Sequence, residues 1–216
     1  IRDPFISNQN GTAVILRAGE PSRRIENKLI KKYLERLELK IIEMPDKTKL
    51  CADGGEFYFC KKENVLFSGL RRNTIDGANF VAEAMNVNKL IIFKGEGFHL
   101  DTFFTPAINS TGDITALIIC TEILDRKSKN LLHQFADEKN LPIFDIPIND
   151  AIGTKNKIGK FAANALPLPG ILIRPNYFSD PSIDKHLDDL GIKTIITSTN
   201  QYQLSGGSVH CITNEL

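Results

Sequence analysis

Residues 2–17, RDPFISNQNGTAVILR, decide how this chain is expected to fold. Two runs of strand-forming residues, 2–7 and 12–17, stand on either side of Asn10-Gly11, a dipeptide typical of a tight hairpin turn. A helix is expected to begin at the capping residue Ser22, and residues 40–44 form the next strand-like run. The segment therefore predicts a ββαβ unit.

The expected helix has apolar residues every three or four positions, which is the spacing of a helix with one buried face. These residues are Ile25, Leu29, Ile30, Tyr33, Leu34 and Leu37. We expect this stripe to pack against the strands of its unit.

The same order of elements recurs three more times along the chain. A period of roughly fifty residues indicates a repeat architecture, in which each unit is too small to bury its own face and packs on its neighbours. The predicted fold class is α/β, with the repeated ββαβ units closed into a ring that protects their edges; an ordinary open α/β sheet is the alternative. The later units are expected at 55–60, 65–70, 74–85 and 89–94, then from 99 with 114–120, 124–136 and 143–148, then from 161 with 171–174, 182–190 and 194–198.

Residues 204–216, LSGGSVHCITNEL, place a cysteine just behind a glycine pair. We expect a strand here, because bare glycines let a ligand approach the backbone closely and would put Cys211 at the mouth of a cavity. This strand has no unit of its own. We therefore expect residues 1–216 to be a single catalytic domain that lacks an N-terminal unit.

Composition excludes several classes of partner. With 216 residues, 42% of them hydrophobic, the chain can bury a core, and 27 Lys and Arg against 26 Asp and Glu leave no basic excess for nucleic acid. The longest apolar runs have strand length, so no membrane span is expected. Four cysteines without a CxxC pair argue against zinc and against a disulfide scaffold, and no export signal is visible, which favours a reducing cytoplasm. Small molecules are the expected partners.

The beginning of each unit carries a residue with useful chemistry. These are Asp3, Asp53, and the pair His99 and Asp101, while Cys211 stands near the chain end. If the units surround an axis, the strand beginnings converge and these side chains meet. A cysteine can supply a thiolate, a histidine can move a proton, and a carboxylate can orient the histidine. Asp3 and Asp101 suit the planar fork of a guanidinium.

Strand alternation assigns the acid and base role to one histidine. If His99 faces the pocket, Asp101 does too, whereas His210 is expected to point away from the side that Cys211 faces. Arg23 and Arg72 are candidates for holding a substrate carboxylate, although solvated surface charge explains either equally well. Other signals are weaker: residues 153–160 imitate a phosphate loop but are expected to be an ordinary loop, and His133 and His186 are expected to face solvent on helices.

In combination these motifs resemble the guanidino-group modifying enzymes of the pentein superfamily, which includes arginine deiminase, dimethylarginine dimethylaminohydrolase, agmatine deiminase and the amidinotransferases. The co-linear order of the motifs covers almost the whole chain. The matching stretches are IRDPF (1–5), similar to the deiminase RDPF; RAGEPSRRIE (17–26), similar to PGxPSRRxE; ADGGEF (52–57), similar to (E/D)GGD; RNT (72–74) with Gly77, similar to RTNxxG; FHLDTFFTP (98–106), similar to HLDT; and GGSVHCIT (206–213), similar to the terminal cysteine motif of agmatine deiminases.

The resemblance implies a five-bladed propeller and a division of roles. It implies that Cys211 attacks the guanidinium carbon to form a thiouronium, that His99 protonates the leaving amine and then activates water, and that Asp53 orients His99. By the same resemblance, Asp3 and Asp101 bind the guanidinium nitrogens, and Arg23 and Arg72 match positions that hold the amino acid carboxylate. Neither a metal nor an organic cofactor is expected.

The sequence also departs from the pattern. Asp101 matches deiminases and amidinotransferases, Arg23 matches the dimethylarginine enzymes, and Glu56 stands where Asp is usual. We expect a cysteine hydrolase of guanidino compounds, with an unmethylated substrate such as L-arginine, that gives citrulline or another ureido product. The alternatives are an amidinotransferase, which passes the same intermediate to an amine, and a non-catalytic binding protein on the same fold. Whether the chain forms a homodimer is left open.

Overall fold

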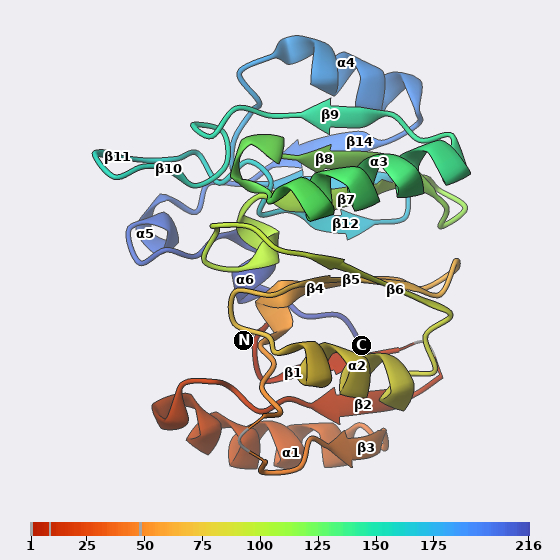
Figure 1. Ribbon diagram of the computed structural model, residues 1–216, viewed down its shortest axis with the longest axis vertical. Coiled ribbons are helices and arrows are strands. Elements are labelled where there is room, and N and C mark those ends of the chain that lie inside the picture. Colours follow the sequence, from red (N-terminus) through yellow and green to blue (C-terminus); the bar gives the residue numbers. More distant parts are fainter. Residues whose placement is uncertain (1, 9, 48) are drawn as a thin grey trace.

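The computed structural model describes residues 2–8, 10–47 and 49–216, so Ile1 of the IRDPF motif lies outside the described residues. Four ββαβ units follow one another along the chain (Figure 1). In each, two antiparallel strands are followed by a helix and a third strand that pairs in parallel with the second. The predicted repeat is confirmed.

Each unit forms its own three-stranded sheet. The first unit contains β1 (Phe5–Ser7), β2 (Thr12–Ile15), α1 (Glu26–Arg36) and β3 (Lys40–Glu43); the second contains β4 (Phe57–Cys60), β5 (Val65–Gly69), α2 (Ile75–Ala84) and β6 (Lys89–Phe93). The third contains β7 (Phe104–Ile108), β8 (Ile114–Ile119), α3 (Arg126–Lys139) and β9 (Ile143–Asp145); the fourth contains β12 (Leu166–Leu168), β13 (Ile171–Arg174), α4 (Pro181–Asp189) and β14 (Lys193–Ile196).

The first strands of the four units line a common cavity of about 890 Å³. Strand β7 packs against both β4 and β12, so neighbouring units contact through these inner strands. The end of the chain, residues 214–216, also lines the cavity. The units are therefore arranged around one shared axis, with their helices on the outside (Figure 1).

Local sequence signals explain where the helices begin. The side chains of Thr74, Asp125 and Asp180 accept hydrogen bonds from backbone N–H groups in the first turns of α2, α3 and α4. Pro181 occupies the first position of α4, where its missing N–H costs nothing. These caps fix where the crossover helices of the second, third and fourth units begin.

The predicted buried face of the first helix is wrong in part. Ile25 and Leu29 are 73% and 72% exposed and Tyr33 is 49% exposed, whereas Leu34 is fully buried. The first turn is a separate 3-10 helix, η1 (Pro21–Ile25), and α1 then presents Leu34 to Phe5 and Ile15. Three short strands offer a narrow surface, so one row of the helix suffices to cover it.

The predicted terminal strand is also wrong. After α5 (Asn200–Gln203) the chain turns at Gly206, whose φ of +81° favours glycine, and residues Val209–Ile212 form a short helix, α6. Thr213 closes α6 by donating from its hydroxyl to the carbonyl of Val209. A run of four residues is too short for periodicity to separate a strand from a helical turn.

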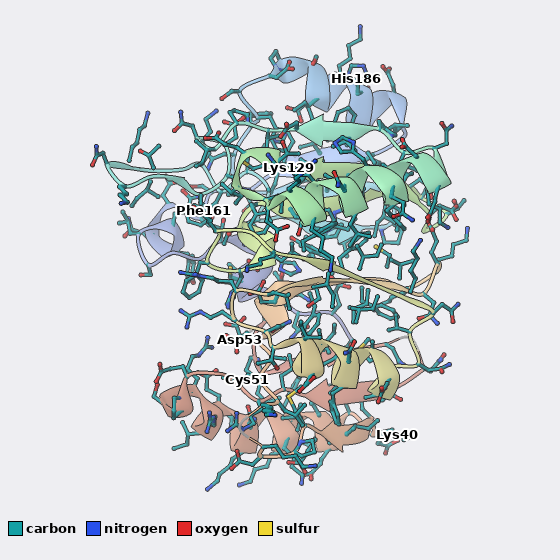
Figure 2. All side chains as sticks on the ribbon, in the orientation of Figure 1. Lys40, Cys51, Asp53, Lys129, Phe161 and His186 are labelled. Atoms are coloured by element: carbon teal, nitrogen blue, oxygen red, sulfur yellow. The ribbon has the colours of Figure 1, made fainter. Side chains whose placement is uncertain are left out.

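Smaller predictions are settled by burial and pairing. Residues 153–160 contain a hairpin, β10 (Gly153–Thr154) with β11 (Lys157–Ile158), where a loop was expected. His133 and His186 are exposed on α3 and α4 as predicted, and Figure 2 shows His186 far from Asp53. No helix in the described ranges has the length and apolar character needed to cross a membrane.

Candidate active site

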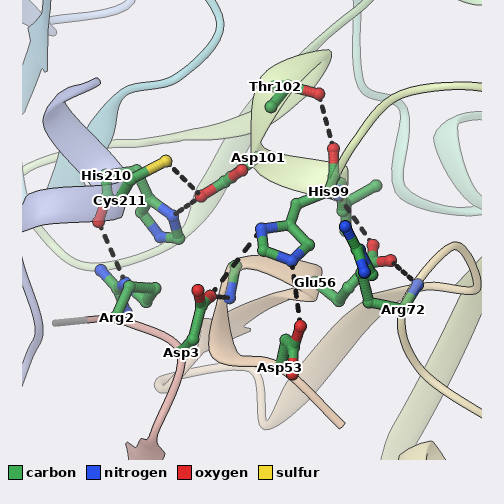
Figure 3. A network of polar contacts seen from close by, with 12 residues as sticks. Arg2, Asp3, Asp53, Glu56, Arg72, His99, Asp101, Thr102, His210 and Cys211 are labelled. Carbon is green, nitrogen blue, oxygen red and sulfur yellow. Dashed lines mark hydrogen bonds and ion pairs between the residues drawn. The ribbon is translucent and has the colours of Figure 1, made fainter. Parts of the chain in front are cut away.

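The beginnings of the inner strands converge, as the repeat predicted. Asp3 lies just before β1, Asp53 immediately precedes the 3-10 turn η2 (Gly54–Glu56) before β4, and His99 immediately precedes the 3-10 turn η3 (Leu100–Thr102) before β7. Nε2 of His99 lies 3.3 Å from Oδ2 of Asp53, and Nδ1 lies 3.8 Å from Oδ1 of Asp3 (Figure 3). Three units therefore each contribute one side chain to this cluster.

The glycine pair of ADGGEF makes this approach possible. The backbone N–H of Gly54 donates to the carbonyl of Asp3 over 3.0 Å, and the N–H of Gly55 donates to Oδ1 of Asp3 over 3.0 Å. A Cβ on Gly55 would lie 2.5 Å from Nδ1 of His99. Only a residue without a side chain leaves room for the imidazole here.

His99 carries a proton at neutral pH. It is 3% exposed, and burial alone would lower its pKa, but the hydrogen bond to Asp53 and the charges of Asp3 and Asp101 outweigh burial and raise the pKa to about 9. The ring is therefore an imidazolium and can donate a proton.

Asp3 already forms an ion pair within the chain. Nη1 of Arg23 lies 2.5 Å from Oδ2 of Asp3, and Nε of Arg23 lies 2.9 Å from Glu26. Burial raises the pKa of Asp3, but the charge of His99 and the hydrogen bonds from Arg23 and the Gly55 N–H bring it below its ordinary value. Arg23 was predicted to bind the carboxylate of the substrate, and Asp3 was predicted to bind its guanidinium. In the structure these two side chains bind each other.

Cys211 stands on α6 beside Asp101. Its Sγ lies 3.5 Å from Oδ2 of Asp101 and 3.2 Å from Nδ2 of Asn164. Burial and the charge of Asp101 raise the pKa of the thiol far above its ordinary value. The resting side chain is therefore a protonated thiol.

Asp101 connects the cysteine to the rest of the cluster. It is fully buried, and burial raises its pKa to about 7, although the charge of His99 opposes this. Among the described residues, its Oδ1 has no hydrogen-bond partner. The charge of Asp101 acts on both His99 and Cys211, and Figure 3 shows the sulfur turned toward this carboxylate.

His210 lies in the cluster, contrary to prediction. Its Nδ1 is 2.8 Å from Oδ2 of Asp101, and its ring stacks on Tyr58 with centroids 4.2 Å apart. The prediction failed because it assumed strand alternation, whereas α6 is helical and places neighbouring side chains about a hundred degrees apart. The cavity along the axis begins behind this ring: its lining includes Arg2 and His210, and Cys211 is not part of it.

Sequence reasoning missed Asn164. This fully buried residue donates from Nδ2 to the carbonyl of Asp101 over 3.1 Å as well as to Cys211, and its Oδ1 accepts the backbone N–H of His210 over 3.0 Å. Asn164 lies two residues before β12, so it precedes the first strand of the fourth unit, as Asp53 and His99 precede the first strands of theirs. Applying the rule of strand beginnings to the fourth unit would have found it.

Glu56 was noted only as a departure from the motif. It is fully buried and accepts the backbone N–H groups of Leu100 and Arg72 over 2.8 and 2.6 Å, so it ties the second unit to the third. Burial raises its pKa. Glu56 therefore supports the turn that carries His99.

Arg72 lies at the surface, away from Asp3. Its guanidinium stacks over the ring of Phe98 at 4.4 Å, and the Phe98 ring is 4.6 Å from that of His99. Of the cysteines, Cys60 and Cys120 are buried, while Cys51 is half-buried and accepts a hydrogen bond from Arg17. No three His, Cys, Asp or Glu side chains in the described part of the chain are grouped as ligands for a metal ion.

No protein-family model matches the sequence. Among solved structures, the chain is similar to unliganded ArgZ, an arginine dihydrolase from the ornithine-ammonia cycle in cyanobacteria, at 19% identity and a TM-score of 0.80, over 97% of this chain and 31% of ArgZ. It is similar to unliganded AgrE at 20% identity and a TM-score of 0.80, over 97% of this chain and 29% of AgrE.

The chain also resembles a dimethylarginine dimethylaminohydrolase in its adduct with 4-chloro-2-hydroxymethylpyridine, at 18% identity and a TM-score of 0.71, over 98% of this chain and 75% of that enzyme. This chain spans about a third of the length of the first two proteins. At this level of identity the likeness establishes the fold, and the fold class predicted from the sequence is confirmed.

Proposed function

From the pentein α/β fold of this chain, we propose that it is a cysteine-dependent hydrolase of guanidino compounds that works through a covalent thiouronium on Cys211. One observation supports the proposal above others: a thiol, an imidazolium and three carboxylates from separate units meet, and two buried carboxylate oxygens, Oδ1 of Asp101 and Oδ1 of Asp53, have no partner among the described residues. A buried acceptor of this kind favours a ligand that brings N–H donors.

Asp101 and Asp3 are the proposed guanidinium ligands. A guanidinium offers five N–H donors in one plane, so it can bridge two carboxylates edge-on. Oδ1 of Asp101 is unpartnered in the described structure, and substrate displaces Arg23 from Oδ2 of Asp3. The guanidinium carbon then lies beside Cys211, whose sulfur already contacts Asp101.

The bound cation is what activates the thiol. In the resting site, burial and Asp101 favour the protonated form of Cys211, but a guanidinium placed next to the sulfur favours the thiolate. The thiol loses its proton to solvent, which the partly exposed Cys211 can reach directly, while Asp101 stays ionised. The sulfur then bonds to the guanidinium carbon and gives a tetrahedral adduct.

His99 serves both halves of the reaction. As an imidazolium it protonates the departing nitrogen, so the C–N bond breaks, ammonia leaves and a thiouronium remains on Cys211. The now neutral imidazole removes a proton from water, the water oxygen bonds to the same carbon, and the C–S bond breaks. One guanidinium and one water thus give one ureido product and one ammonium ion. Asp53, 3.3 Å from Nε2, orients the ring and sustains its charge.

The substrate is proposed to be unmethylated at the nitrogens that meet Asp3 and Asp101. A methyl group there removes an N–H donor and leaves a buried carboxylate oxygen unsatisfied, which costs about 1–3 kcal/mol. Arg23, at 35% side-chain exposure beside Asp3, is free to turn to a substrate carboxylate once displaced. These features favour L-arginine, with Arg72 at the rim as a second proposed carboxylate contact.

A panel of three guanidines tests the proposal. The protein is incubated with L-arginine, asymmetric dimethylarginine and agmatine, and the ureido product is scored against ammonia and dimethylamine. We expect ureido product and ammonia from L-arginine. Inertness toward all three would contradict hydrolysis and revive the non-catalytic alternative. Formation of a new guanidino compound only when glycine is added would identify an amidinotransferase.

A further inference from the structure

His210 has no task in the reaction described above, yet it is one of the most constrained side chains near Cys211. It is 1% exposed, and its Nδ1 lies 2.8 Å from Oδ2 of Asp101. Tyr58 stacks on one face of its ring, Asn164 accepts its backbone N–H, and Arg2 donates from Nε to its carbonyl over 3.4 Å. Asn164 and Arg2 thus hold the backbone of His210, while Tyr58 and Asp101 hold its ring.

The contact with His210 gives the two carboxylate oxygens of Asp101 different surroundings. Oδ2 faces His210 and Cys211, while Oδ1 is buried without a partner in the described residues. An imidazole that carries its proton on Nδ1 donates to Oδ2 and fixes the rotation of the carboxylate. Oδ1 is then held toward the side from which a ligand N–H can approach.

We propose that His210 is a positioning residue that keeps Asp101 ionised and aims its free oxygen at the substrate guanidinium. The inference rests on the proposed function, because it takes Asp101 as a guanidinium ligand. It adds a specific requirement to that function: the histidine beside the nucleophile acts through the carboxylate and remains neutral throughout.

The charges around the pair support this assignment. Burial, together with the charges of Arg2 and His99, lowers the pKa of His210 far below its ordinary value, so the ring is a neutral donor. Burial raises the pKa of Asp101 to about 7, so at neutral pH its ionised form is only narrowly maintained. A hydrogen bond donated to the charged form favours that form. The titratable and charged groups that face Asp101 are Arg2, Asp3, Tyr58, His99, His210 and Cys211.

Two substitutions separate donation from packing. His210→Phe keeps a ring on Tyr58 but removes the donor, whereas His210→Asn places an amide N–H near the position of Nδ1. In His210→Phe we expect the KM for L-arginine at pH 7 to rise about tenfold and the acid limb of kcat/KM to move up by about one pH unit, with the defect shrinking toward pH 9. His210→Asn should return the limb to its wild-type position.

The controls keep the test independent of folding and of turnover. His133→Asn, on the exposed face of α3, should leave the profile unchanged. If His210→Phe does not fold, His210→Gln replaces it, because its longer amide no longer places the donor at Nδ1. Binding of L-arginine to Cys211→Ser, with and without the His210 substitutions, is measured by calorimetry from pH 6 to 9 as a second readout.

The outcomes distinguish this inference from the proposed function. An active enzyme whose acid limb is unmoved in His210→Phe, or whose limb moves equally in His210→Asn, would overturn the inference and leave the hydrolase intact. In a different outcome, the wild type is inactive while Cys211→Ser binds L-arginine, with an acid limb of the binding pH profile that shifts in the His210 variants. That result would overturn the hydrolase and sustain the inference. Failure of Cys211→Ser to bind L-arginine at any pH would overturn the inference directly.

Discussion

The pKa values of His99 and Asp101 both lie above their ordinary values. The proposed mechanism needs His99 protonated and Asp101 ionised at the same time. Asp101 must be ionised to bind a guanidinium, and burial places its pKa at about 7. His99 must be protonated to release the leaving group, and Asp53 with the nearby carboxylates places its pKa at about 9 despite burial. Both requirements are met only between these values.

We therefore predict a bell-shaped dependence of kcat/KM on pH. Activity should rise as pH increases through about 7, because Asp101 loses its proton, and fall as pH increases through about 9, because His99 loses its own. Asp53→Asn should move the alkaline limb to lower pH and reduce kcat by about 10²–10⁴-fold. Asp46→Asn, at the surface, is the control. A profile that is flat between pH 6 and 10 would contradict the assignment.

Arg23 competes for the same carboxylate that the substrate needs. Its guanidinium lies 2.5 Å from Asp3 in the structure. Arg23→Gln should therefore lower the KM for agmatine, which has no carboxylate, and raise the KM for L-arginine, each by about fivefold, as expected for a partly exposed ion pair. Steady-state kinetics on both substrates measure this. Arg24→Gln removes a neighbouring charge whose hydrogen bonds go to the backbone carbonyls of Ala18 and Gly19, and it is the matched control. Equal shifts for the two substrates would contradict the competition.

The 3-10 turns before β4 and β7 are the elements that carry the site. They bring Gly55 against His99 so closely that a Cβ on Gly55 would lie 2.5 Å from Nδ1. Gly55→Ala should displace the imidazole and reduce kcat by at least about a hundredfold, because a shift of 1 Å in a catalytic group has effects of this size. Activity is compared with thermal stability. Gly19→Ala, whose Cβ would make only an ordinary van der Waals contact, 4.0 Å from the carbonyl oxygen of Arg72, is the control. Full activity in Gly55→Ala would contradict the placement of His99.

How far the sequence predicts these elements depends on whether the signal is local. The hairpin at Asn10-Gly11 is local and is predicted correctly. The predicted cap Ser22 is wrong, because Ser22 lies inside η1 and its hydroxyl donates to Glu20. The exposed face of α1 depends on how wide a sheet it meets, and the helical turn at Cys211 depends on what Asn164 and Arg2 bind. Both features depend on contacts with segments far away in the sequence, so the neighbouring residues do not predict them.

The candidate site follows the same division. Asp3, Asp53, His99 and Asp101 are found because each stands at the beginning of a strand in a repeated unit. Asn164 also stands there but was not sought, and His210 was excluded by an alternation that applies only to strands. Its contact with Asp101 crosses from the end of the chain to the third unit, and no sequence period encodes it.

At the scale of the whole molecule, the end of the chain ties the first unit to the second along the axial cavity. Asn214 donates to the carbonyls of Phe5 and Arg2, and the carbonyl of Glu215 accepts from Ser7 over 2.6 Å. The side chain of Glu215 also lies 4.0 Å from Lys61 of the second unit. The segment that carries Cys211 is thereby held against β1.

Asn214→Ala should lower the free energy of unfolding by about 1–3 kcal/mol, because two buried carbonyls lose their donor. It should also reduce activity, since Arg2 donates its backbone N–H to the carbonyl of Cys211 from the same segment. Denaturant unfolding and the guanidine assay measure the two effects. Asn156→Ala, in the exposed β10–β11 turn, is the control. Unchanged stability would show that the tail does not hold the units together.

Mass spectrometry of the intact protein, quenched with acid during turnover of L-arginine, tests most directly whether Cys211 is the nucleophile. The account predicts a covalent adduct that maps to the peptide containing Cys211, disappears when substrate is exhausted, and is absent from Cys211→Ser together with all hydrolysis. Turnover by Cys211→Ser, or turnover by the wild type with the adduct on another residue, would contradict it.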